Sequence, residues 1–178
     1  MLQYLDRRFA VEKIIQASPV VFLLHDVEEI LTIEQFWREN RYRLPIPEML
    51  RDRIRITTAE MAAAVTCVFV LGCLASWPTT KSSEPDTRIE VYGTTLSIRL
   101  LNALAHLAGT LVLRRYTPGV ITAVTVVLPY TLYTFHRLHR KKLLIEGALV
   151  RSVALGTLLH LPMVLGAQAA GKPLARLL

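Results

Sequence analysis

The stretch TTAEMAAAVTCVFVLGCLASW, residues Thr57–Trp77, decides the class of fold. Its length is close to the roughly 20 apolar residues that a helix needs to cross a bilayer core of about 30 Å. In soluble domains apolar residues recur with a helical or strand period, whereas here they fill whole blocks. Three further blocks follow, at Tyr92–Leu113, Gly119–Phe135 and Leu143–Ala170. The sequence therefore predicts an all-α, polytopic transmembrane helix bundle.

Composition and charge agree with a membrane location. The chain has 178 residues, of which 52% are hydrophobic, and a formal net charge of +7. Its lysines and arginines gather between the apolar blocks, where such residues anchor helices against anionic lipid headgroups. The sequence holds no basic motif interleaved with aromatic residues, so nucleic-acid binding is not expected. We expect an integral, multi-pass protein of a bacterial cytoplasmic membrane, surrounded by membrane lipids.

The chain is predicted to form one membrane-embedded domain, residues 1–178, with about five helices. The first helix is more polar than the others and begins near Ala17, with Ser18 as its N-cap and Pro19 as its first helical residue. It is either a poor span or a helix that the other four screen from lipid. The predicted helices cover about 17–40, 57–77, 92–113, 119–136 and 143–170.

The first helix carries an unusual polar cluster within SPVVFLLHDVEEILTI, residues Ser18–Ile33. Burial of an unpaired charge in such an apolar segment is costly. In a helix, His25, Glu28 and Glu29 project from one face, because residues three and four apart are neighbours. One imidazole nitrogen and two carboxylates form a ligand set for a divalent metal ion, with zinc or iron preferred, and also suit acid/base chemistry. The apolar side of the same helix is made by Val20, Leu24, Val27 and Leu31.

The third predicted helix contributes a second polar face, because Arg99, Asn102 and His106 lie at helical spacing. His106 would join His25, Glu28 and Glu29, so that two nitrogen and two carboxylate ligands meet. Ionisable residues inside spans normally face the bundle interior, where they pair or do chemistry. Two more residues, Glu60 and His160, are candidates for a second site or for orienting the ligands through hydrogen bonds.

A structural alternative remains open for these charges. Arg99 and Arg151 could neutralise Glu28, Glu29 or Glu146 as buried ion pairs without any metal. His160 could be a hydrogen-bonding contact between helices, and Glu60 could be a solvated residue at a helix end. Asp26 lies about 100° around the helix from His25, so we expect it to meet the backbone or an arginine.

Three motifs in order carry a family resemblance. They are HDVEE at His25–Glu29, NALAH at Asn102–His106, and YTPG at Tyr116–Gly119 followed by VITAVTVVLPY. With these motifs the chain closely resembles the HXXEE-domain family of small membrane proteins. The resemblance implies that His25, Glu28, Glu29 and His106 are functional positions. It further implies that Tyr116, Pro118 and Gly119 shape the rim of the site, and it implies no particular activity.

Two functions from different classes fit these residues. The first is an intramembrane enzyme of isomerase, cyclase, lyase or hydrolase type, in which the His/Glu cluster binds a metal ion or does acid/base chemistry on a lipophilic small molecule. The second is a transporter or binding module that uses the same cluster for a cation or a proton. The lack of a visible internal repeat argues against a carrier, since many carriers are built from duplicated halves.

Overall fold

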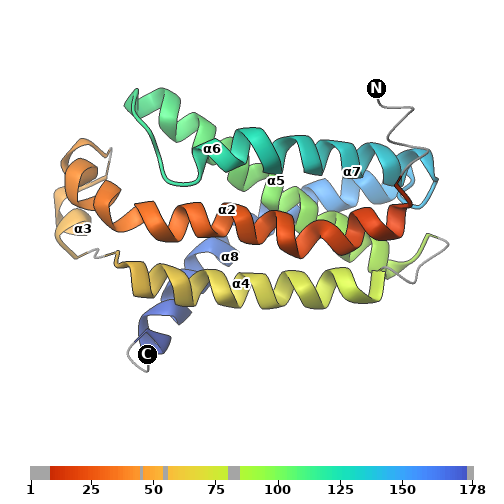
Figure 1. Ribbon diagram of the computed structural model, residues 1–178, viewed down its shortest axis with the longest axis horizontal. Helices are drawn as coiled ribbons and strands as arrows, with labels where there is room; N and C mark the ends of the chain where they lie inside the picture. The colour runs from red at the N-terminus through yellow and green to blue at the C-terminus, as the bar shows by residue number, and fades with distance from the viewer. Residues whose placement is uncertain (1–8, 45, 54–55, 80–84, 176–178) are drawn as a thin grey trace.

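The computed structural model describes residues 9–44, 46–53, 56–79 and 85–175, and Figure 1 shows them as a bundle of helices. The all-α prediction is confirmed, with five main helical rods. Two short helices, η1 (Arg41–Arg43) and α3 (Glu48–Arg53), follow the first rod. The rods are α2 (Val11–Asn40), α4 (Thr58–Thr79), α5 (Thr87–Leu113), the continuous run α6 (Val120–Thr122), η2 (Ala123–Val127) and α7 (Leu128–Arg140), and α8 (Glu146–Leu174).

Three of the described helices are long and apolar enough to cross a membrane: Thr58–Trp77 in α4, Thr87–Leu113 (α5) and Glu146–Leu174 (α8). The chain is therefore a membrane protein. The predicted span at Gly119–Phe135 is helical but is not among these three. It is interrupted by the π-helical segment η2, and it continues into a polar end with basic residues in its last turn.

Several predicted helix boundaries need correction. The first helix begins at Val11 instead of Ala17, so Ser18 is not its N-cap and Pro19 lies inside it. The apolar and small residues Val11, Ile15 and Ser18 continue the buried stripe of this helix backwards, and burial of that stripe favours the longer helix. Helix α5 also begins earlier than predicted, because the Asp86 carboxylate caps it by accepting a hydrogen bond from the Ile89 N–H at 3.0 Å.

Around its middle turn, helix α2 buries polar residues and exposes apolar ones, although apolar side chains such as Phe22 and Trp37 are also buried. His25 and Asp26 are 1% and 2% exposed, while Val20 and Leu31 on the opposite side are 62% and 72% exposed. This arrangement is the reverse of a helix on a soluble protein and fits a helix whose outer face meets lipid. Figure 1 shows α2 lying between α4 and the α6–η2–α7 rod, both of which it contacts. The screening predicted for this helix therefore covers its polar side only.

Small residues let α5 and α8 pack closely. The Cα of Gly93 faces Ser152, and a Cβ at position 93 would lie 2.9 Å from the Ser152 Oγ. A Cβ on Gly156 would collide with the Cβ of Ser97, so glycine permits this helix crossing. After the close crossing, the following turns of α8 line the same cavity as Asn102 and His106 of α5.

Candidate functional site

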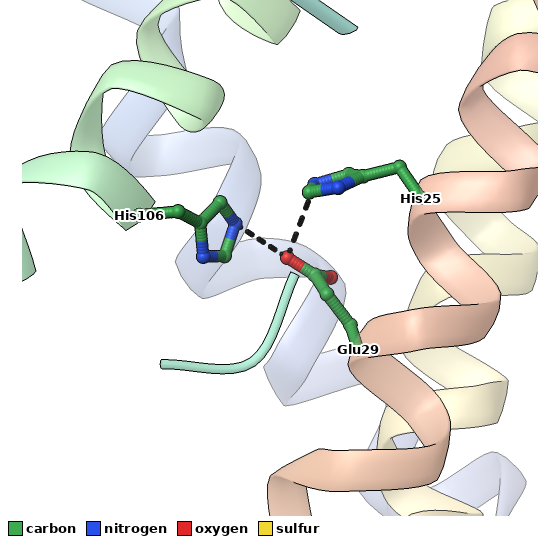
Figure 2. Close-up of side chains that lie close together, drawn as sticks. All are labelled: His25, Glu29 and His106. Atoms are coloured by element: carbon green, nitrogen blue, oxygen red, sulfur yellow. Dashed lines mark ion pairs between the residues drawn. The ribbon is translucent and has the colours of Figure 1, made fainter. Parts of the chain in front are cut away.

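The site is built from one turn of α2 and one turn of α5. Figure 2 shows Glu29 reaching between the two imidazole rings, with His25 and Glu29 projecting from α2 and His106 from α5. Glu29 Oε1 lies 2.6 Å from His106 Nε2 and 3.4 Å from His25 Nε2. One ligand atom from each of the three residues lies within 4.8 Å of the other two. The predicted approach of His25 to His106 is confirmed.

The atoms that converge here are rich in lone pairs. The amide of Asn102 lies between the rings, with Nδ2 at 3.2 Å from His25 Nε2 and 3.0 Å from His106 Nε2. An amide nitrogen donates and the Glu29 carboxylate oxygen accepts, so an imidazole nitrogen that faces both can bond to only one of them, according to whether it carries a proton. A proton or a metal ion placed among Glu29 Oε1 and the two Nε2 atoms would have lone pairs from all three directed at it.

Gly119 closes one side of the group. Its backbone has a φ of +82°, which favours glycine. A Cβ at this position would lie 2.8 Å from His25 Cε1, 2.9 Å from Glu29 Cγ and 3.2 Å from His106 Cε1. The turn that ends the YTPG motif therefore lies directly against all three side chains, as the resemblance implied for the rim of the site.

Glu28 points away from this group, although the sequence predicts it as a ligand. Its Oε1 accepts hydrogen bonds from the Tyr116 hydroxyl at 2.7 Å and the Ile121 N–H at 3.2 Å. Its Oε2 accepts from the Thr122 N–H at 2.7 Å and from the Thr122 hydroxyl. Four donors occupy the lone-pair sites of one carboxylate, and two of them are backbone groups at the start of the α6 rod. Burial raises the pKa of the Tyr116 phenol, and its hydrogen bond to Glu28 raises that pKa further.

Thr122 is a site residue that the sequence analysis did not name. Its hydroxyl oxygen lies 3.0 Å from His25 Nδ1, on the side of the ring opposite the Glu29 contact. The only signal in the sequence is its position three residues after Gly119, one turn into the helix that the YTPG motif opens. Side-chain contact with α2 could not be read from that position alone.

Arg99 does not neutralise Glu28 or Glu29. Its guanidinium donates to Asp26 Oδ1 at 3.0 Å and lies over the Phe22 ring, 4.7 Å from the centroid. The expected contact of Asp26 with an arginine is thereby confirmed. The other arginine considered, Arg151, pairs with Glu90 at 2.6 Å. These two arginines therefore pair with Asp26 and Glu90, and Glu28 and Glu29 have other partners.

Glu60 and His160 are not brought into the group. Glu60 Oε2 accepts from the Thr57 N–H at 3.2 Å, and the Thr57 hydroxyl accepts from the Glu60 N–H at 3.2 Å. This reciprocal pair is a capping box at the start of α4. His160 lines a cavity beside the site, and its buried Nε2 has no hydrogen-bond partner among the described residues.

The cavity has a volume of about 360 Å³ and lies among α2, α4, α5 and α8. Glu29, Asn102 and His106 form part of one wall, next to the Asp26–Arg99 pair. Most of the other lining residues are apolar, among them Ile33, Phe36, Val68, Leu113 and Val164. A polar spot in a mostly apolar cavity of this size is the usual form of a small-molecule site.

The fold and the site together define a helical membrane protein with a buried His–Glu–His group. The family model described as "Protein of unknown function with HXXEE motif" matches residues 17–134, so the chain belongs to the HXXEE family. It is similar to "Uncharacterized protein YrkK" of Bacillus subtilis (strain 168), with 22% identity over 142 residues. That match covers 79% of this chain and 84% of the relative. No solved structure matches the chain.

Proposed function

We propose that this protein is a membrane-embedded enzyme in which His25, Glu29 and His106 hold a divalent metal ion, zinc or iron, and act on a lipophilic small molecule. One observation carries the proposal: Glu29 and His106 belong both to the His–Glu–His group and to the wall of the apolar cavity. A reactive group in the wall of a mostly apolar cavity suits an apolar substrate with one functional group.

The donor set supports a catalytic rather than a structural metal. Two imidazole nitrogens and one carboxylate occur in catalytic zinc sites and in non-haem iron sites, both of which leave coordination positions open. Neighbouring ligands of tetrahedral zinc, each about 2.0–2.2 Å from the ion, lie roughly 3.4 Å apart. The 3.4 Å between His25 Nε2 and Glu29 Oε1 fits that spacing, whereas the 2.6 Å between Glu29 Oε1 and His106 Nε2 is shorter, so these two groups would have to move apart to hold an ion. A bound ion would supply Lewis acidity or an activated water.

The same residues can also work without a metal. Glu29 Oε1 and His106 Nε2 are 2.6 Å apart, close enough to share a proton. A proton held there can be delivered to a double bond or a carbonyl of a bound molecule and taken back from another atom, as in isomerisation, cyclisation or elimination. The apolar lining of the cavity supports either form of the enzyme over the transporter alternative. We place the protein in a bacterial cytoplasmic membrane.

The metal content of the purified protein tests the metal-dependent form of the proposed enzyme. The full-length protein, purified in detergent from cells grown with Zn²⁺ or Fe²⁺, is expected to hold about one ion per chain by elemental mass spectrometry. His25→Gln and His106→Gln should lose the ion and remain folded by circular dichroism. His136→Gln removes an exposed histidine of α7 and is the matched control, which should keep the ion. Wild-type protein without an ion would overturn the metal form.

Solvent exchange tests the acid/base form. Wild-type protein is incubated in D₂O with the apolar lipid extract of its expression host, and the extract is then searched by mass spectrometry for a compound that gains deuterium. The gain should be absent with Glu29→Gln. If wild type neither holds an ion nor labels any compound, the proposed enzyme is wrong.

A further inference from the structure

The ring of His25 is held from both sides, and the two sides have opposite hydrogen-bonding character. Nε2 faces Glu29 Oε1 and Asn102, while the hydrogen-bond partner of Nδ1 among the described residues is the Thr122 hydroxyl at 3.0 Å. A neutral imidazole carries one proton, and the hydrogen bond made by one nitrogen decides which nitrogen carries it. The direction of the Thr122 hydroxyl proton therefore controls what His25 offers to the site.

The Glu28 carboxylate sets the direction of the Thr122 hydroxyl proton. The carboxylate receives hydrogen bonds from two backbone N–H groups, from a phenol and from the Thr122 hydroxyl, all of which are donors. A group surrounded by donors alone is ionised and only accepts. The Thr122 hydroxyl proton thus points to Glu28, and its oxygen presents a lone pair to His25. Its second acceptor, the Gly119 carbonyl at 3.3 Å, would use the same proton and leave the same lone pair.

We propose that Glu28 and Thr122 are positioning residues that hold the proton of His25 on Nδ1, so that Nε2 is a free lone pair directed at Glu29 and His106. This inference deepens the proposed function and rests on it, because the tautomer matters only where Nε2 is a metal ligand or a base. Metal-bound histidines are usually oriented by a hydrogen bond between their second ring nitrogen and a carboxylate or another acceptor. It also gives Glu28 a role in the site without making it a ligand.

The arrangement links the site to the YTPG motif. Tyr116 binds the same Glu28 oxygen as the Ile121 N–H, and Thr117 is tied to α5 by a 3.0 Å hydrogen bond from its hydroxyl to the His106 carbonyl. The turn that places Gly119 against the rings therefore also delivers the two donors of Thr122 to Glu28. The α5–α6 connection and the first turn of α6 therefore contact the His25 ring and are fastened to the α5 backbone at His106.

The experiment reads the tautomer directly, on full-length protein in nanodiscs without added metal. Long-range ¹H–¹⁵N correlation on ¹⁵N-histidine protein distinguishes Nδ1–H from Nε2–H, and loss of a signal in His25→Gln assigns the ring. Wild type should show Nδ1–H at His25. Thr122→Val keeps the shape and removes the hydroxyl, so it should shift His25 towards Nε2–H, and Thr122→Ser should restore Nδ1–H. Thr125→Val deletes a nearby hydroxyl bonded to the Ile121 carbonyl and should change nothing.

Zn²⁺ binding gives the second readout. Thr122→Val should weaken binding about 10- to 100-fold, the usual effect of removing a hydrogen-bond partner of a metal ligand, with recovery in Thr122→Ser. Wild-type His25 protonated on Nε2 or on both nitrogens overturns the inference whether or not any variant folds, and so does an unchanged tautomer in Thr122→Val. If the tautomer behaves as expected but wild type binds neither Zn²⁺ nor Fe²⁺, the metal form of the proposed function fails and the positioning role stands.

Discussion

Three carboxylates within one turn of α2 have three different partners. Asp26 pairs with a guanidinium, Glu28 receives four hydrogen bonds from the α5–α6 connection and the start of α6, and Glu29 meets two imidazoles. Each step along a helix turns the side chain by about 100°, so neighbouring acids enter different surroundings. These surroundings decide which acid pairs with an arginine, which positions another residue and which meets the imidazoles.

Removal of charge from Asp26 should therefore change stability, whereas removal of charge from Glu29 should change metal binding. Asp26→Asn strands the buried Arg99 and should lower the free energy of unfolding by about 3–5 kcal/mol. Glu29→Gln should leave unfolding nearly unchanged but abolish metal binding, because the amide keeps the shape and loses the charge. Chemical unfolding in detergent micelles and Zn²⁺ titration measure the two quantities.

Glu90→Gln provides the control for this comparison, since it removes the partner of Arg151 in a far more exposed pair and should have little effect. An Asp26→Asn protein as stable as wild type would show that the pair with Arg99 contributes nothing to the fold.

The sequence predicts part of this site. The helical spacing of the histidines and acids, together with the motifs, predicts that His25, Glu29 and His106 come together. The hydrogen bonds of Glu28 could not be predicted, because their donors are the Tyr116 hydroxyl, two backbone N–H groups and the Thr122 hydroxyl, 88 to 94 residues away along the chain. A pattern within one helix shows which face a residue occupies and does not show which neighbour will meet it.

At the scale of elements, the connection from α5 to α6 includes two residues with positive φ, Arg114 and Gly119. Helix α5 ends at Arg114 in a left-handed conformation with a φ of 50°, and α6 begins after Gly119 with a φ of +82°. The hydroxyl of Thr117 fastens the segment between them to α5. The turn that reverses the chain is thus also a wall of the site.

Gly119→Ala should damage the site through this turn. A non-glycine residue in left-handed conformation costs about 1–2 kcal/mol, and the added Cβ must also displace His25 or Glu29. We expect a lower unfolding temperature and loss of Zn²⁺ affinity by calorimetry. Gly72→Ala is the matched control, because a Cβ there meets nothing within 4 Å and alanine favours a helix. Full Zn²⁺ affinity in Gly119→Ala would contradict the close approach of the turn.

Helix boundaries were predicted less well than helix existence. The sequence predicts that this helix begins near Ala17, with Pro19 as its first helical residue, because proline is common in the first turn of a helix. The buried residues Val11, Ile14, Ile15 and Ser18 show that the amphipathic stripe extends before it. The proline is accommodated inside the helix, where its missing N–H removes a single backbone bond.

At the scale of the whole molecule, the bundle encloses a cavity that four helices share. Its walls combine apolar side chains with the polar residues of α2 and α5, and no single helix would reveal it. The composition of the chain predicts the membrane bundle, and the polar cluster predicts a polar interior. The volume and position of the cavity depend on how α8 crosses α5 at Gly156, which no periodic pattern records.

Filling the cavity should separate ligand binding from metal binding. Val68→Trp places a large ring among the lining residues, so a photoreactive long-chain alcohol should label this variant far less than wild type. Its Zn²⁺ content should be unchanged, since Val68 lies outside the His–Glu–His group. Val70→Trp is the control, because Val70 is 49% exposed on the outer side of α4. Equal labelling of both variants would show that the alcohol binds elsewhere.

The polar inner side of α2 has a consequence for how the protein is made. A helix with three acids near its centre is a poor substrate for insertion on its own, because each charged residue at mid-bilayer costs about 2.5–3.5 kcal/mol on the insertion scale. Helices α4, α5 and α8 are each long and apolar enough to cross a membrane without such partners. We therefore expect α2, although it leaves the ribosome before them, to become fully embedded only after α5 and the α6 rod offer Arg99, His106 and Thr122 as partners. Assembly of the reactive group and completion of membrane insertion would then be one event.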